Sequence, residues 1–302
     1  MCPGCRAILD PGVPLCPYCG WDVALTDVRR KGGLVERTLR PVGGLVPALL
    51  FANVLVAALV VVVHVKFIGR YAPGHRSAID LVIDGVLGPN GLVMLLMGSA
   101  GSDLVIEKGQ AWRLLTCVFL HFGILHIGVN MMSLRNIGGL LEDAYGSGKA
   151  LALYLLSGLA ASAASVGWHV LRDRTGGHPD PFNMAGASGA ICGYAGLIAA
   201  LGFRIGGDEG RRLWTSMVKS VGIIVVIGFV LEFTKSSFRL ANSAHLGGFL
   251  FGLAAGFLCT FGIRCRGNPL AVKVWDAVAI LLALLTAASF APAARDVMDA
   301  LR

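Results

Sequence analysis

Seven long apolar stretches, separated by shorter polar segments, run through this 302-residue chain. Each has roughly the 17 to 25 residues that a helix needs to cross the hydrocarbon core of a bilayer. Charged residues make up 15% of the chain and apolar residues 55%, whereas a soluble domain has about 25% and about 45 to 50%. Too few charges remain to cover a globular surface in water, so a soluble enzyme is excluded and an all-α polytopic membrane protein is predicted. The predicted spans are 45–67, 114–134, 150–170, 186–203, 213–233, 241–263 and 274–291.

Two of these spans are weaker than the rest, and a further apolar segment is too irregular to be one. Lys219 interrupts the fifth span near its start, and the seventh is barely long enough before Pro292. The long loop 68–113 contains an apolar stretch, 81–97, with three glycines and a proline inside it. Since these residues disfavour a continuous helix, we expect this stretch to lie at the membrane interface without crossing it.

Basic residues predict the orientation of the chain. With the N-terminus in the cytoplasm, 15 Lys and Arg lie on that side and 11 on the other, which is the bias expected of cytoplasmic loops. The first span follows residue 42 and is too long for a cleavable signal sequence. We therefore expect a multi-pass protein with a cytoplasmic N-terminus, in the plasma membrane of a prokaryote.

Four of the eight cysteines form two C-x2-C pairs within the first 19 residues: Cys2, Cys5, Cys16 and Cys19. This pattern is typical of a tetrahedral zinc site, with disulfides or a redox pair as the alternatives. A metal would also stabilise a segment of about 20 residues, which is too small for a sufficient apolar core. We predict a structural zinc ribbon over 1–22, followed by a basic linker over 23–42.

The remaining cysteines show no shared pattern, and we assign them no common chemistry: Cys117, Cys192, Cys259 and Cys265. The ribbon and linker together carry six Lys or Arg against four Asp or Glu, with few aromatic residues. That balance argues against nucleic-acid binding as their role. A cytoplasmic protein is the partner that we expect for the ribbon.

Strongly polar residues inside predicted spans are costly in a bilayer and therefore point to function or to a protein interior. Ser188 begins the fourth span, where free backbone N–H groups and the helix dipole favour an oxyanion. His245, in the sixth span, is the candidate base for its hydroxyl. His126 and Asn130, four residues apart, lie on one face of the second span.

Small residues indicate how closely the fourth and sixth spans approach. G-x3-G spacing lets two membrane helices pack with their backbones in contact. The glycines concerned are Gly189, Gly193 and Gly196 on one span and Gly248, Gly252 and Gly256 on the other. This packing is what would bring Ser188 and His245 together.

Each of these residues also has an ordinary structural interpretation. Ser188 is a favourable helix N-cap residue, and His245 is compatible with a buried, hydrogen-bonded histidine. His126 and Asn130 are residues that join membrane helices by hydrogen bonds. We assign His121 a structural role, and we expect His64 to reach the interface from the end of the first span.

Six motifs occur in one order along the chain: Trp112-Arg113, His121-x4-His126-x3-Asn130, Asn130-Met131, Gly138-x3-Glu142, Gly186-Ala-Ser188-Gly-Ala and Ala244-His245-x-Gly-Gly-x3-Gly. In this combination, over residues 96–263, the sequence resembles the rhomboid intramembrane serine proteases. The resemblance implies a six-helix core over 43–267, with a seventh transmembrane helix and tail over 268–302. The ribbon lies outside the pattern.

The resemblance also implies roles for individual residues. Ser188 and His245 would form a catalytic dyad without an acidic third member and without a catalytic cofactor. His126 and Asn130, with the backbone N–H of Ser188, would form the oxyanion hole. Trp112 and Arg113 would belong to the structured long loop, and Glu142 would help to hold the core together.

One position departs from the family pattern. Family members often have an aromatic residue one turn after the serine, where its ring stacks on the catalytic histidine; this chain has Cys192 there. We expect an intramembrane serine endopeptidase that cleaves single-span membrane proteins in or near their transmembrane segments. The alternative is a non-catalytic rhomboid-like protein that binds transmembrane helices in quality control or trafficking, and Cys192 is the feature that favours it.

Overall fold

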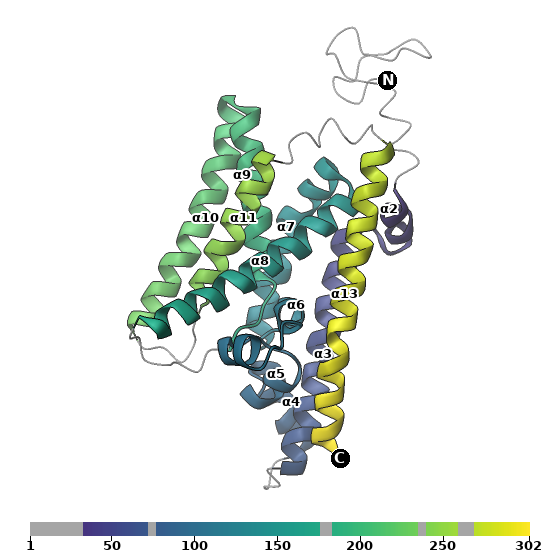
Figure 1. Cartoon of the computed structure of the whole chain (residues 1–302), viewed down its shortest axis with the longest axis vertical. Helices are drawn as coiled ribbons and strands as arrows, with labels where there is room; N and C mark the ends of the chain where they lie inside the picture. The colour runs from purple at the N-terminus through teal and green to yellow at the C-terminus, as the bar shows by residue number, and fades with distance from the viewer. Residues whose placement is uncertain (1–32, 72–76, 176–182, 235–239, 259–268) are drawn as a thin grey trace.

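The computed structural model describes residues 33–71, 77–175, 183–234, 240–258 and 269–302. These residues are almost entirely helical (Figure 1), and the bridge between Ala100 and Met184 is the β-pairing among them. The first elements are α2 (Leu34–Leu39), η1 (Arg40–Val42), α3 (Leu45–Tyr71), α4 (Ala78–Leu87), α5 (Gly91–Leu96), the π-helix η2 (Asp103–Glu107), α6 (Arg113–Thr116) and η3 (Cys117–Phe119). The others are α7 (Ile124–Tyr145), α8 (Ser147–Arg174), α9 (Ser188–Ile205), α10 (Gly207–Phe233), α11 (Asn242–Leu258) and α13 (Pro269–Leu301).

Five helices are long and apolar enough to cross a membrane, namely α3, α8, α9, α10 and α13. The number is six if the bent pair formed by residues 113–119 and α7 is counted as one span. Helix α11 follows the sixth predicted span for 17 residues, and positions 259–263 of that span lie outside the described residues. The chain therefore has the polytopic helical architecture expected from its apolar stretches.

The second predicted span is wrong as a single helix over 114–134. Two short helical segments end at Phe119, and α7 begins at Ile124 after a bend of 89°. The reason lies at Gly123, which has a φ of 109°, a conformation that glycine adopts at little cost. A side chain there would collide with the carbonyl of Leu87. Packing against the end of α4 therefore breaks the helix inside an apolar stretch.

The seventh span is longer than predicted, because α13 continues from Pro269 through Pro292 to Leu301. Proline lacks a backbone N–H, but membrane helices tolerate it where neighbouring groups compensate. Helix α13 contacts α3 and packs more extensively against α8, and Figure 1 shows it on the opposite side of the molecule from α9, α10 and α11.

The long loop folds into short helices. Helices α4 and α5 have 10 and 6 residues, too few to span a bilayer, in line with the prediction that 81–97 does not cross. His64 does not extend from the end of α3 as we expected. Its side chain is buried, and its Nδ1 accepts a hydrogen bond from the Asn90 backbone N–H at 3.0 Å. The contact joins α3 to the start of α5.

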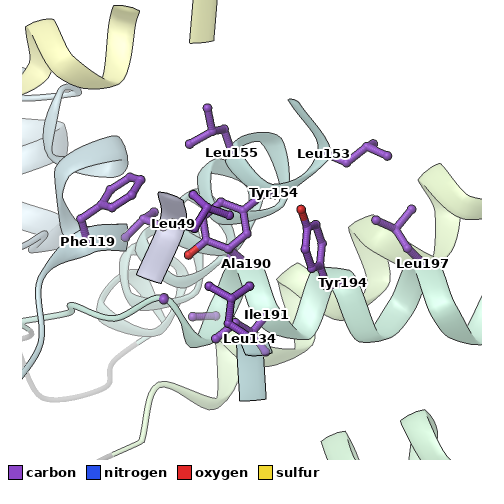
Figure 2. Close-up of a cluster of buried hydrophobic side chains, with 14 of the residues drawn as sticks. Leu49, Phe119, Leu134, Leu153, Tyr154, Leu155, Ala190, Ile191, Tyr194 and Leu197 are labelled. Carbon is purple, nitrogen blue, oxygen red and sulfur yellow. The ribbon is translucent and has the colours of Figure 1, made fainter. Parts of the chain in front are cut away.

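Helix α9 packs against α7, α8, α10 and α11. Tyr194 and Tyr154 are fully buried and pack edge to face with ring centroids 5.5 Å apart (Figure 2). The Tyr194 hydroxyl donates to the carbonyl of Ala150 at 2.8 Å. Leu49, Phe119 and other buried residues from neighbouring elements complete this apolar core.

The glycines of α9 and α11 bring the two backbones into direct contact. A Cβ at Gly248 would collide with the carbonyl of Gly189, and one at Gly252 with the carbonyl of Gly193. One at Gly196 would lie 2.6 Å from the backbone nitrogen of Leu253. The G-x3-G spacing therefore acts as predicted, and no layer of side chains separates the two helices here.

Glu142 joins the end of α7 to the start of α3. Its carboxylate accepts hydrogen bonds from the Leu45 backbone N–H at 2.8 Å and from the Ser147 hydroxyl at 2.7 Å. A carboxylate at a helix N-terminus satisfies unpaired N–H groups and interacts favourably with the helix dipole. Glu142 thus ties α3, α7 and α8 together, as the sequence motif led us to expect.

Candidate active site

Ser188 is the first residue of α9, and an extended segment leads into it. Met184 in this segment exchanges two backbone hydrogen bonds with Ala100, at 2.8 and 2.9 Å. The N–H of Gly186 donates to the carbonyl of Cys117 at 2.8 Å. Gly186 has a φ of 136°, which disfavours other residues. The turn before α9 is thus fixed on both sides by the long loop and by η3.

His245 lies in the first turn of α11 and reaches Ser188. Its Nε2 is 2.9 Å from the Ser188 Oγ, the separation of a hydrogen bond. The ring is almost completely buried, and its Nδ1 has no hydrogen-bond partner among the described residues. The expected contact between the two side chains is present.

His126 lies beside the same turn, at the start of α7. Its Nδ1 accepts a hydrogen bond from the Phe122 backbone N–H at 3.3 Å, so a neutral ring carries its proton on Nε2. A Cβ added at Gly186 would lie 2.8 Å from that Nε2. The bend before α7 therefore aims an N–H donor at the segment that carries Ser188.

Asn130 lies one turn after His126 on α7 and is 4% exposed. Its Nδ2 has no hydrogen-bond partner within the described residues. A buried amide donor without a partner is uncommon and costs free energy. No hydrogen bond joins Asn130 to Ser188 in the part of the chain that the structure describes. The support for Asn130 as an oxyanion donor is therefore its place on the His126 face of α7 and its unpaired Nδ2.

Two other residues keep to the protein interior. The His121 ring is buried and packs edge to face on His126, with centroids 5.1 Å apart. Cys192 is buried and packs near Ala195 and Val221. The Tyr194 hydroxyl donates to the Ala150 carbonyl and its ring packs on Tyr154, so this ring is engaged elsewhere in the core. The departure at Cys192 is therefore not compensated by that tyrosine.

A cavity of about 640 Å³ opens on Ser188, His126 and His245. It extends between the C-terminal ends of α8 and α10, and several polar and aromatic residues that the sequence motifs missed line it. They are Trp168, His169, Arg172, Asn183, Phe229, Glu232 and Asn242. The proximity of Asn242 to His245 in the sequence was the available signal. The cavity is large enough for several side chains and water.

No group of three or more His, Cys, Asp or Glu side chains suited to a metal ion occurs within the described ranges. The predicted zinc ligands Cys2, Cys5, Cys16 and Cys19 lie outside those ranges, as do Cys259 and Cys265.

The Rhomboid domain family matches residues 108–261, just over half of the chain. The chain belongs to the rhomboid family. The match includes the Ser188–His245 contact, the α7 face with His126 and Asn130, and the glycine contacts between α9 and α11. The match ends before α13 and begins after most of the long loop.

Curated relatives agree with this assignment. This rhomboid is 30% identical over 227 residues to "RHOMBOID-like protein 1" of Arabidopsis thaliana, covering 71% of the present chain and 52% of the relative. It is 35% identical over 179 residues to "RHOMBOID-like protein 5" of the same plant, covering 57% and 52%. With "Rhomboid protease GluP" of Bacillus subtilis (strain 168) it shares 33% identity over 161 residues, covering 53% and 28%. The matches thus span about half of these plant relatives and less of the bacterial protease.

Proposed function

We propose that this rhomboid is an intramembrane serine endopeptidase that cleaves single-span membrane proteins in or near their transmembrane segments. The observation that carries the proposal is the 2.9 Å contact between Ser188 Oγ and His245 Nε2 on the wall of a cavity. A serine hydroxyl is a weak nucleophile until a neighbouring base accepts its proton, and histidine is the usual base. The similarity to a relative named a rhomboid protease supports the same activity.

The proposed reaction has two steps. Ser188 Oγ attacks the peptide carbonyl while His245 Nε2 accepts the hydroxyl proton, which it then gives to the leaving amine. Water, activated by His245, hydrolyses the resulting acyl-enzyme and restores the serine. The Nε2–H of His126, the amide of Asn130 and the Ser188 backbone N–H are the proposed donors to the developing oxyanion. None of these steps requires a cofactor.

A fluorophosphonate probe tests the proposed nucleophile without knowledge of the substrate. An activated serine oxygen attacks phosphorus and displaces fluoride, so we expect one covalent adduct, mapped by mass spectrometry to Ser188. The labelled protein should lose cleavage of a model single-span substrate in liposomes in proportion to the labelling. Absence of an adduct, together with no cleavage across a broad panel of single-span substrates, would favour the helix-binding alternative.

We further propose that residues 1–22 hold structural zinc and that the N-terminus is cytoplasmic, in a prokaryotic plasma membrane, where the ribbon binds a protein partner. The support is the spacing of the four cysteines and the bias of basic residues. The purified protein should contain about one zinc ion per chain, measured by elemental analysis. Cys16→Ser should lose most of it and Cys192→Ser should keep it; equal zinc in both would refute the ribbon.

A further inference from the structure

Helix α13 is attached to the rest of the protein at three levels. Near its start, Asp276 is buried and its carboxylate accepts a hydrogen bond from the Leu34 backbone N–H of α2 at 2.5 Å. At its end, the Tyr71 hydroxyl of α3 donates to the carbonyl of Ala300 at 2.7 Å. Between these two, Asp296 lies 3.9 Å from the guanidinium of Arg113. The middle contact is the ion pair that joins α13 to the end of the long loop, at the start of α6, where α13 also packs against α5 and α6.

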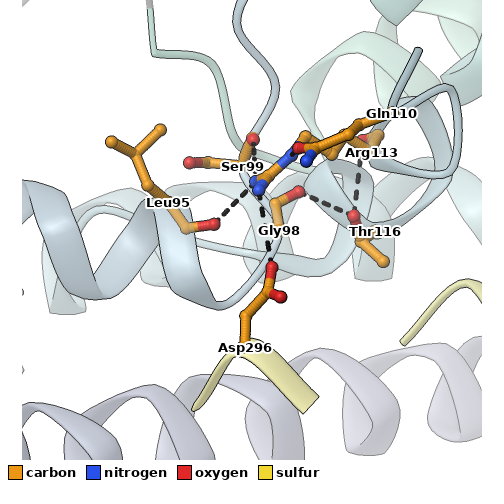
Figure 3. A network of polar contacts seen from close by, with 7 residues as sticks. All are labelled: Leu95, Gly98, Ser99, Gln110, Arg113, Thr116 and Asp296. Atoms are coloured by element: carbon orange, nitrogen blue, oxygen red, sulfur yellow. Dashed lines mark hydrogen bonds and ion pairs between the residues drawn. The ribbon is translucent and has the colours of Figure 1, made fainter. Parts of the chain in front are cut away.

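Arg113 is the centre of a network inside this loop (Figure 3). Its Nη1 donates to the carbonyls of Leu95 and Ser99 at 2.6 and 2.9 Å, and its Nε donates to the side chain of Gln110 at 2.6 Å. The guanidinium also lies over the Trp112 ring. With Arg113 only 4% exposed, its charge is costly without an opposite charge nearby, and Asp296 supplies one from α13.

One of the residues that Arg113 binds is next in the chain to a residue that pairs with the segment before Ser188. Ser99, whose carbonyl Arg113 holds, is followed by Ala100, which pairs with Met184 through two backbone hydrogen bonds. Met184 belongs to the extended segment that ends at Ser188. Thr116 also holds this part of the loop, because its hydroxyl donates to the carbonyl of Gly98 at 2.6 Å. A short series of contacts therefore connects Asp296 to the segment that carries Ser188: the ion pair with Arg113, the hydrogen bond from Arg113 to Ser99, and the pairing of Ala100 with Met184.

We propose that Asp296 of α13 is a positioning residue for the Ser188 site, which acts by holding Arg113 and, through it, residues 95–100 against the segment before α9. This inference rests on the proposed protease function for its kinetic consequence. It assigns a role to a helix outside the matched Rhomboid domain, so the helix contributes to the reaction without touching substrate. Because the pair is long and Asp296 is 41% exposed, its contribution is modest.

Asp296→Asn in the full-length protein tests the proposal, with Asp299→Asn as the matched control. Asp299 lies on the same helix and pairs with the exposed Arg302 at 3.5 Å, away from the loop. We expect Asp296→Asn to lower kcat about two- to fivefold, the range of a partly exposed ion pair, with KM unchanged. Hydrogen exchange should accelerate in peptides covering 98–101 and 183–188. Asp296→Glu should restore both, and Asp299→Asn should match the wild type.

The two readouts separate this proposal from the protease proposal. If the wild type cleaves nothing, the proposed function fails, while local hydrogen exchange still decides whether Asp296 positions the segment before Ser188. Equal exchange in Asp296→Asn and Asp299→Asn would overturn the positioning role. So would faster exchange spread over all helices, because that pattern reports a general loss of stability.

Discussion

Replacing Ser188 by alanine is expected to reduce cleavage of a single-span substrate to background, a loss of about 10⁴-fold or more. The substitution removes the oxygen that lies 2.9 Å from His245 Nε2 and that attacks the peptide carbonyl in the proposed mechanism. His245→Ala should cause a loss of similar size. Cleavage kinetics in liposomes, followed by the appearance of the two product fragments, measure both.

The double variant gives this prediction its sharpest form. Since nucleophile and base act as one unit, Ser188→Ala combined with His245→Ala should be no slower than either single variant. Ser157→Ala is the matched control. Ser157 is also a buried helical serine, but its Oγ has no hydrogen-bond partner among the described residues. The Ser157→Ala variant should therefore cleave the substrate at the wild-type rate. Cleavage by Ser188→Ala at the wild-type rate would refute the mechanism.

Removing the donor of Asn130 should produce the next largest effect. Asn130→Asp keeps the shape of the side chain but replaces the unpaired Nδ2 donor by an acceptor, which would repel a developing oxyanion. We expect kcat to fall about 10²- to 10³-fold, the usual cost of one oxyanion-hole donor, with little change in KM. Steady-state kinetics over a range of substrate concentrations separate the two constants.

His126→Phe should show the same split between kcat and KM, because it retains an aromatic ring near Phe122 but lacks the Nε2–H donor. Met132→Ala, on the same helix and 60% exposed, is the control and should behave as the wild type. A kcat within twofold of the wild type for Asn130→Asp would remove Asn130 from the oxyanion hole. A raised KM with unchanged kcat would instead assign it to substrate binding.

The apolar stretches predicted the position of a helix well where length and hydropathy alone determine it. The predicted first and fifth spans are present as α3 and α10 with longer ends. Hydropathy could not reveal the bend before α7, because it depends on Gly123 meeting the end of α4. It also misplaced the end of α13, since the cost of Pro292 depends on what surrounds it.

Some features of the candidate site could also be predicted from the sequence, and others could not. Glycine spacing predicted that α9 and α11 touch, and this approach brings Ser188 and His245 together. The catalytic roles themselves remain predictions. Asp296 could not have been chosen from the sequence, because no local pattern links a carboxylate in the last helix to Arg113 in the long loop. The cavity residues Glu232 and Arg172 likewise come together only through the ends of α10 and α8.

The direct contact between the backbones of α9 and α11 has a practical consequence for protein engineering. Because backbone atoms of the two helices touch, the distance between their backbones near Ser188 and His245 should change little when side chains elsewhere on α9 and α11 are replaced. Redesign of the outward-facing residues of α3 and α10, to suit another detergent or a thicker lipid environment, should therefore be compatible with intact chemistry. Substitution of the glycines at the contact between α9 and α11 should not be tolerated, because an added Cβ would collide with the backbone of the other helix.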